Sequence, residues 1–137
     1  LIANVGDSRA YLYRNFQIKQ LTEDHTLVQE LLKSGEITEE EAKSHPQRNI
    51  VTQSLGITLN VQIDFVRVSL KNEDTIFLCS DGLSNMIEDH YIKEILGNYS
   101  DVETQANKAV EAANEAGGRD NITVAIAKYT AREEVEQ

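Results

Sequence analysis

Residues 75–82 have the sequence Thr75-Ile76-Phe77-Leu78-Cys79-Ser80-Asp81-Gly82, in which an uncharged apolar run leads directly into a carboxylate. A short run of this composition predicts a strand that is buried in the core. Asp81 then stands on a rigid element at the rim of the core, where a hard divalent cation finds the oxygen ligands that it requires. Asp is also a common turn former, so a purely local role for Asp81 stays open.

Two more carboxylates lie at predicted strand ends. Asp120, in Gly118-Arg119-Asp120-Asn121, precedes the apolar run of residues 122–127. Asp7, in Gly6-Asp7-Ser8-Arg9, falls between strands predicted at 1–5 and 10–13. Three carboxylates in this setting weaken the turn-only interpretation without removing it, because the spacing does not show that they converge.

The remaining pattern predicts alternating strands and short helices. Helices are expected at 27–34 with a C-cap at Gly35, at 38–45 after a Thr38/Glu41 capping box, at 89–96, and after a Ser100/Glu103 capping box. Strands are expected at 16–21, at 122–129, and across 61–70 with a β-bulge where the alternation shifts by one residue. Few helices between the strands favour an α+β fold with a largely antiparallel sheet.

Composition excludes several classes of function. The 137 residues suit one soluble domain, with 40% hydrophobic and 26% charged residues. The net charge of −10 makes nucleic acid an unfavourable partner, because an acidic surface repels phosphate backbones. No apolar stretch is long enough to span a membrane. Cys79 is the only cysteine, which excludes an internal disulfide and favours a cytoplasmic location.

Four motifs occur in the order of a known family: Ala3–Tyr11, Leu21–His25, Ser80–Leu83 and Gly118–Thr123. The ordered set resembles the PPM (type-2C) metal-dependent protein Ser/Thr phosphatases, and their bacterial members most, up to about Tyr129. The resemblance implies a two-layer antiparallel β-sandwich flanked by helices, with a metal centre in a cleft at one end. It also implies a mobile flap beside that cleft, at about residues 32–58.

The resemblance further implies a chemistry. Two Mn²⁺ or Mg²⁺ ions, with a possible third, activate a bridging water that hydrolyses phosphoserine and phosphothreonine on proteins. Asp81 and Asp120 correspond to ligands of the paired ions, and Asp7 to a ligand of the third. Asn121 and Gly82 adjoin these ligands and support them.

The flap brings further candidates. Lys43, His45 and Arg48 are expected to contact the substrate protein, although a solvated surface loop is the alternative. His25, His45 and His90 share no metal-ligand spacing, and none of them is assigned to catalysis.

Family members are longer on the N-terminal side, so residues 1–130 are expected to be the C-terminal portion of the phosphatase domain, with a frayed tail at 131–137. The family's phosphate-binding Arg, its Asp-Gly-x-Gly-Gly segment and its acid His are not found here. The alternative function is therefore a catalytically incompetent fragment that acts as a metal-binding or interaction module.

The expected partners are phosphorylated substrates of a bacterial Ser/Thr kinase, and an N-terminal half or a second copy. The apolar faces expected to be partly uncovered are those of Ile2, Val5, Phe77, Ile122, Val124 and Ile126.

Overall fold

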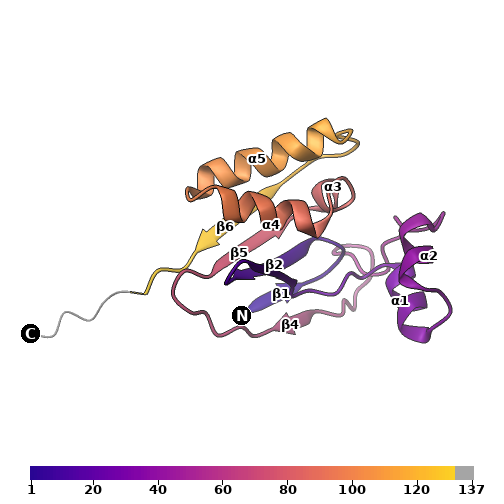
Figure 1. Ribbon diagram of the computed structural model, residues 1–137. Coiled ribbons are helices and arrows are strands. Elements are labelled where there is room, and N and C mark those ends of the chain that lie inside the picture. Colours follow the sequence, from indigo (N-terminus) through magenta and orange to yellow (C-terminus); the bar gives the residue numbers. More distant parts are fainter. Residues whose placement is uncertain (132–137) are drawn as a thin grey trace, which may run out of the picture.

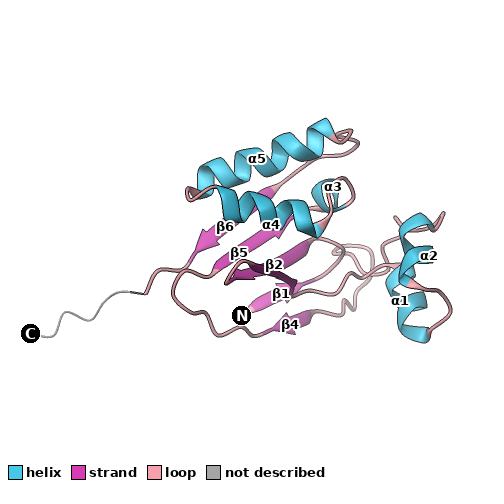
Figure 2. Ribbon diagram, in the orientation of Figure 1, coloured by secondary structure: helices cyan, strands magenta, loops and turns pink. Residues whose placement is uncertain are grey.

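The computed structural model describes residues 1–131; all but the first residue of the predicted tail at 131–137 lies outside this range. Figure 1 shows the order of the elements along the chain, and Figure 2 distinguishes the helices from the strands. The strands are β1 (Ile2–Asn4), β2 (Arg9–Arg14), β3 (Gln17–Gln20), β4 (Asp64–Val66), β5 (Thr75–Cys79) and β6 (Val124–Lys128). The helices are α1 (Leu27–Ser34), α2 (Glu39–Ser44), α3 (Asp81–Ser84), α4 (Asp89–Asn98) and α5 (Val102–Glu115).

The strands form two antiparallel sheets. One has four strands in the order β3-β2-β5-β6, and the other pairs β1 with β4. In the larger sheet, Arg9 pairs with Cys79 and Tyr11 with Phe77, so the first half of the chain is joined directly to the strand that precedes Asp81. The predicted α+β fold with antiparallel sheets flanked by helices is confirmed.

Helices α4 and α5 cover one face of the four-stranded sheet (Figure 1). Alternate residues of the central strands point into this layer because successive side chains of a strand face opposite sides. Tyr11 and Phe77 are fully buried there, with ring centroids 6.2 Å apart in an edge-to-face arrangement. From α5, Ala109 and Ala113 are also fully buried, and these small side chains let the helix approach the strands closely.

The opposite face of the sheet is less covered. Leu78 is 40% exposed, and Ala125 and Ala127 of β6 are exposed beside it. The sequence-based expectation that Phe77 lies on an uncovered face is therefore wrong. Its neighbour Leu78 faces the solvent instead, because helices α4 and α5 pack against the Phe77 side of β5.

Most of the helix ends predicted from capping residues are confirmed. Gly35 ends α1 with a left-handed φ of 75°, and Thr38 and Glu41 form the predicted capping box of α2. The cap of α5 differs, because Asp101 rather than Ser100 accepts the hydrogen bond from the Thr104 N–H.

Two other expectations are corrected. The long bulged strand predicted over 61–70 is reduced to Asp64–Val66, the three residues that pair with β1. A short helix, α3, follows β5 directly and begins at Asp81.

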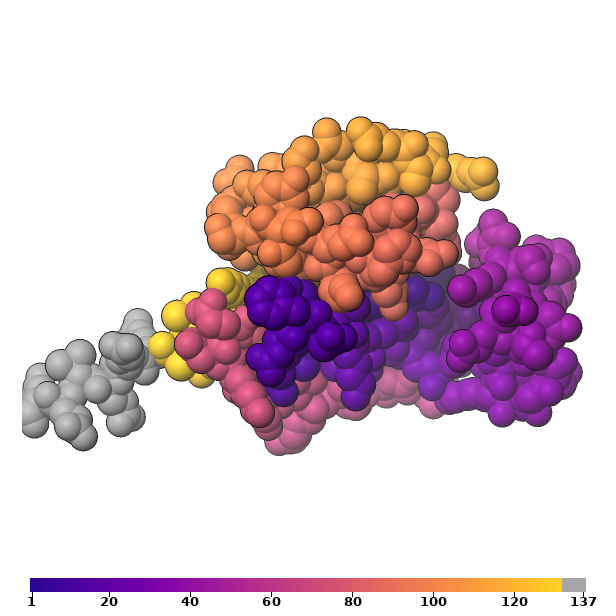
Figure 3. Space-filling view, in the orientation of Figure 1, coloured from indigo at the N-terminus to yellow at the C-terminus, as the bar shows by residue number. Residues whose placement is uncertain are grey.

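Helices α1 and α2 form a lobe at one end of the larger sheet (Figure 1), and in the space-filling view a notch separates this lobe from the helical layer (Figure 3). The lobe is tied to the body at its base, where Thr26 and Val51 form an isolated antiparallel bridge. None of the helices in residues 1–131 has the length and apolar character needed to span a bilayer.

Candidate functional site

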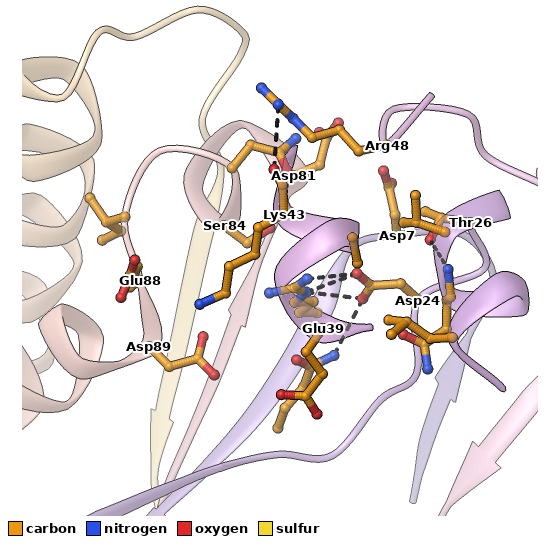
Figure 4. A pocket seen from close by; sticks show the side chains of 18 of the residues that line it. Asp7, Asp24, Thr26, Glu39, Lys43, Arg48, Asp81, Ser84, Glu88 and Asp89 are labelled. Atoms are coloured by element: carbon orange, nitrogen blue, oxygen red, sulfur yellow. Dashed lines mark hydrogen bonds and ion pairs between the residues drawn. The ribbon is translucent and has the colours of Figure 1, made fainter. Parts of the chain in front are cut away.

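A pocket of about 790 Å³ lies where the β1–β2 turn, the α1–α2 lobe and the start of α3 and α4 meet. In Figure 4, Asp7, Asp24 and Thr26 lie on one side of this pocket and Glu88 and Asp89 on the other. The charged residues and histidine that line it are Asp7, Arg9, Asp24, Glu39, Lys43, Arg48, Asp81, Glu88, Asp89 and His90. The pocket therefore combines a majority of carboxylates with a few cationic side chains.

Asp7 and Asp81 reach this pocket through the pairing of β2 with β5. Arg9 pairs with Cys79 at the end of the ladder, and the two aspartates each lie two residues beyond that pair. Because the strands are antiparallel, both aspartates leave the same end of the β2–β5 ladder, where both line the pocket. Burial, and then the charge of Asp81, raise the pKa of the Asp7 carboxyl. A carboxylate whose charge is opposed in this way by burial and by a neighbouring carboxylate forms part of a site suited to a cation.

The Arg9 side chain forms hydrogen bonds to Asp24 within the wall of the pocket. Its Nε lies 2.9 and 3.1 Å from the two carboxylate oxygens of Asp24, and its Nη2 lies 2.7 Å from Oδ2. Burial opposes the charge of Arg9, but these hydrogen bonds prevail and raise its pKa. The Tyr11 hydroxyl continues the chain of contacts: it accepts from Arg9 at 3.3 Å and donates to Asp89 at 2.9 Å. This network fixes the relative positions of the turn, the sheet and the start of α4.

Asp120 lies beside this arrangement rather than in the lining of the pocket. It is exposed, and its Oδ1 accepts a hydrogen bond from the Asn121 N–H at 2.7 Å. The Asp120–Asn121 backbone presses on the first turn of α3, where a Cβ added at Gly82 would lie 2.1 Å from the Asn121 carbonyl oxygen. The structure thus brings the Asp120 loop against the Asp81 loop, and Gly82 is required by that close approach.

The predicted flap residues divide into two groups. Lys43 and Arg48 line the pocket. His45 lies outside its lining, and its Nδ1 accepts a hydrogen bond from the Gln47 N–H at 3.1 Å.

The sequence reasoning missed the acidic residues Glu39, Glu88 and Asp89 as parts of the pocket. They stand at the starts of α2 and α4, and no strand-end signal marks them. Asp24 lies in the motif Leu21–His25, but the motif alone does not show that Arg9 is its partner.

Two donor groups of the pocket are of the type that a hard divalent cation binds. Asp7 and Asp81 offer the hard oxygen ligands that Mg²⁺ and Mn²⁺ prefer, and these ions complete their shells with water. Within residues 1–131, no group of three His, Cys, Asp or Glu side chains is arranged to hold an ion. The Asp7–Asp81 pair therefore fits part of the coordination of a hard dication.

Comparisons with known proteins agree with these features. The family model described as Protein phosphatase 2C matches residues 1–31. The serine/threonine phosphatase Stp of Listeria monocytogenes is 47% identical over 126 residues, which cover 92% of this chain and 50% of that relative. The solved serine/threonine phosphatase of S. agalactiae matches with a TM-score of 0.87 and 42% identity, covering 94% of this chain and 53% of that one.

The chain belongs to the protein phosphatase 2C family.

This phosphatase 2C chain spans about half the length of the curated relatives that it matches. A third relative is the catalytic domain of the Ser/Thr protein phosphatase PstP, whose structure is a complex with two manganese ions. It matches with a TM-score of 0.77 and 34% identity, and covers 94% of this chain and 53% of its own. The predicted family and fold are confirmed by these matches.

Proposed function

We propose that residues 1–130 are the C-terminal portion of a phosphatase domain that hydrolyses phosphoserine and phosphothreonine on proteins. The observation that carries the proposal is the Asp7–Asp81 pair in a charged pocket, in a chain whose relatives are named Ser/Thr phosphatases. A bacterial Ser/Thr kinase would supply the phosphorylated substrates, since several relatives are bacterial.

The proposed ligands are hard carboxylates. Asp81 and Asp120 would hold two Mn²⁺ or Mg²⁺ ions together with residues of the N-terminal portion, and Asp7 would share a third ion with Asp81. PstP, which binds two manganese ions, supports the choice of metal. When bound, paired dications supply a water of lowered pKa and neutralise charge on phosphoryl oxygens.

The other residues of the chain have roles of their own in this proposal. Lys43 and Arg48 line the pocket on the side of the lobe and would attract and orient the substrate phosphate. His45, which lies outside the pocket lining, would contact the substrate protein beyond its phosphorylated residue. Gly82 and Asn121 keep the two ligand-bearing loops in close contact.

The proposal is tested in the full-length protein with a phosphothreonine peptide and Mn²⁺. We expect phosphate release that EDTA abolishes, and little release from the matching phosphotyrosine peptide. The charge-removing variant Asp81→Asn should lose activity by orders of magnitude, whereas Lys108→Met, on the exposed face of α5, should not. Equal activity of wild type and Asp81→Asn at saturating Mn²⁺ would contradict the proposed site.

A second candidate is favoured by the exposed side of the larger sheet. Leu78, Ala125 and Ala127 present an apolar surface that a partner segment could cover. In that case the chain acts alone as an interaction module without turnover. The assay above separates the two, because an interaction module gives no phosphate release in any form of the protein.

A further inference from the structure

The His25 side chain is buried and makes two hydrogen bonds that reach different parts of the fold. It is 9% exposed. Its Nδ1 accepts from the Gly6 N–H at 3.1 Å, and its Nε2 lies 2.7 Å from Oδ2 of Asp64 in β4. A backbone N–H can only donate, so Nδ1 is the unprotonated nitrogen and Nε2 carries the hydrogen that it donates to Asp64. The two partners therefore select one tautomer of the ring.

The ring is aimed at the backbone N–H of Gly6, the residue that precedes Asp7. Gly6 has a φ of 106°, a conformation that glycine adopts readily and other residues rarely do. Its N–H is held by the His25 ring, and its carbonyl oxygen accepts from the His25 N–H at 3.0 Å. His25 thus binds both backbone polar groups of Gly6, one through its ring and one through its own N–H.

The same residue reaches the base of the lobe. The His25 carbonyl accepts a hydrogen bond from the Thr52 N–H at 2.8 Å. Asp64, the partner of the ring, pairs with Asn4 across β1 and β4. His25 therefore connects the turn that carries Asp7 with the smaller sheet and with the chain that returns from the lobe.

These hydrogen bonds support the turn that carries Asp7 at the edge of the pocket. Asp7 must stay beside Asp81 although the two carboxylates repel each other, and a turn with no external support would relax away. Hydrogen bonds from neighbouring residues commonly orient metal-binding carboxylates, and their loss typically costs 10–100-fold in metal affinity.

We propose that His25 is a positioning residue that holds the Gly6–Asp7 turn so that the Asp7 carboxylate shares a metal ion with Asp81. The inference rests on the proposed metal-dependent function and assigns His25 no contact with the substrate. Its role is carried by Nδ1, the atom that faces Gly6, rather than by Nε2.

Two substitutions separate the two nitrogens in the full-length protein. His25→Asn keeps an oxygen near the position of Nδ1, which can accept from Gly6, and it loses the bond to Asp64. His25→Gln places its amide near the position of Nε2, which can reach Asp64, and leaves the Gly6 N–H without an acceptor. A positioning role through Nδ1 predicts that His25→Gln weakens Mn²⁺ binding at the Asp7 site about 10-fold or more, while His25→Asn retains most of the affinity.

Mn²⁺ binding is measured from the electron paramagnetic resonance signal of the free ion, and thermal unfolding is recorded for each variant. Equal Mn²⁺ affinities for His25→Gln and His25→Asn would overturn the proposal, since a merely structural histidine would not distinguish them. These measurements need no turnover. An inactive wild-type protein would thus refute the proposed function while leaving the His25 comparison intact.

A nuclear magnetic resonance experiment tests the geometry directly. The N–H···N hydrogen bond between Gly6 and Nδ1 should give a scalar coupling between the two nitrogens in the wild-type protein. Asp64→Asn, whose amide oxygen still accepts from Nε2, should preserve it. Should both His25 variants fail to fold, a wild-type coupling that changes when Mg²⁺ saturates the pocket supports the positioning role. An absent or unchanged coupling overturns it.

Discussion

The Ser80 hydroxyl joins the two loops that carry Asp81 and Asp120: its Oγ donates to the Asn121 carbonyl oxygen at 3.2 Å. The same Oγ accepts from the Thr123 N–H at 3.0 Å, and the Ser80 N–H donates to the Thr123 carbonyl at 3.0 Å. The end of β5 and the approach to β6 are therefore held together by hydrogen bonds between the two proposed ligands, after Asp120 in one segment and before Asp81 in the other.

Gly82→Ala tests how tightly these loops meet. The added Cβ would lie 2.1 Å from the Asn121 carbonyl oxygen, a backbone atom that cannot move without displacing the Asp120 loop. We expect a loss of about 3 kcal/mol in the free energy of unfolding, at the upper end of overpacking costs, together with a loss of activity. Chemical denaturation measures the first effect.

Gly97→Ala is the matched control, because its Cβ would meet only the tip of the Tyr13 side chain, at 3.0 Å. This helical position should tolerate alanine within about 1 kcal/mol. Similar losses of unfolding free energy for Gly82→Ala and Gly97→Ala would show that the close contact between Gly82 and Asn121 is not what destabilises the first variant.

Asp120→Asn should reduce turnover by orders of magnitude in the full-length protein while leaving the fold intact. The side chain is exposed and its main contact is with the adjacent Asn121 N–H, which an amide oxygen can still accept. The loss would therefore come from the missing charge of a ligand. Hydrolysis of p-nitrophenyl phosphate over a Mn²⁺ series measures it, and a near-normal rate at saturating metal would exclude Asp120 as a ligand.

Asp7→Ala should be milder than Asp120→Asn. The proposed ion at Asp7 is the outer one, so the substitution should raise the Mn²⁺ concentration required for activity and leave the paired ions largely in place. Burial and the charge of Asp81 already raise the pKa of Asp7, so the substitution also removes a repulsion. If Asp7→Ala proves as inactive as Asp120→Asn under every Mn²⁺ concentration, Asp7 belongs to the main centre or to the fold.

Asp74 makes stability depend on pH. Its buried carboxylate accepts from Arg14 Nε at 2.8 Å and Nη2 at 2.5 Å, and from the Lys71 N–H at 2.7 Å. The hydrogen bonds from Arg14 outweigh burial and lower the pKa of Asp74. The stabilisation is thus complete above the ordinary Asp pKa and is lost as the pH falls through the lowered value.

Asp74→Asn should therefore lower the free energy of unfolding by about 2 kcal/mol at pH 7. This loss is smaller than that expected for a fully buried ion pair, because Arg14 is partly exposed. The difference from wild type should shrink below about pH 4, where the unfolded aspartate takes up its proton. Urea unfolding at a series of pH values provides the comparison. If the difference in unfolding free energy between wild type and Asp74→Asn stays constant down to pH 2.5, the ion pair between Arg14 and Asp74 is not its cause.

The 137-residue chain by itself should be inactive and should self-associate. Leu78, 40% exposed, lies with Ala125 and Ala127 on an apolar side of the sheet that other chains can cover. Light scattering after size-exclusion chromatography should show dimers or larger species, and Leu78→Lys should shift them toward monomer. A monodisperse wild-type monomer that turns over substrate would contradict both expectations.

Much of the fold was predictable from local pattern. The run before Asp81 gives β5, and the Thr38/Glu41 signal gives the start of α2. Helix α3 was missed because four residues are too few to show a helical period. The strand predicted over 61–70 failed because alternation cannot reveal how much of a segment finds a partner.

The candidate site was predictable only in part. Asp7 and Asp81 were identified from their positions at strand ends, but their proximity depends on the pairing of β2 with β5. Glu88 and Asp89 enter the pocket because α4 packs against the sheet, a tertiary contact that leaves no trace in their own sequence neighbourhood.

The pairing of Arg9 with Cys79 also dictates an order of events during synthesis on the ribosome. Asp81 is translated only after Asp7, the whole α1–α2 lobe and β4. Non-local strand pairing of this kind is slow, because a long loop must close before any contact rewards it. If Asp7 and Asp81 share a metal ion as proposed, that ion can bind only after β5 and Asp81 have left the exit tunnel, so it cannot guide the folding of the lobe that is synthesised before them.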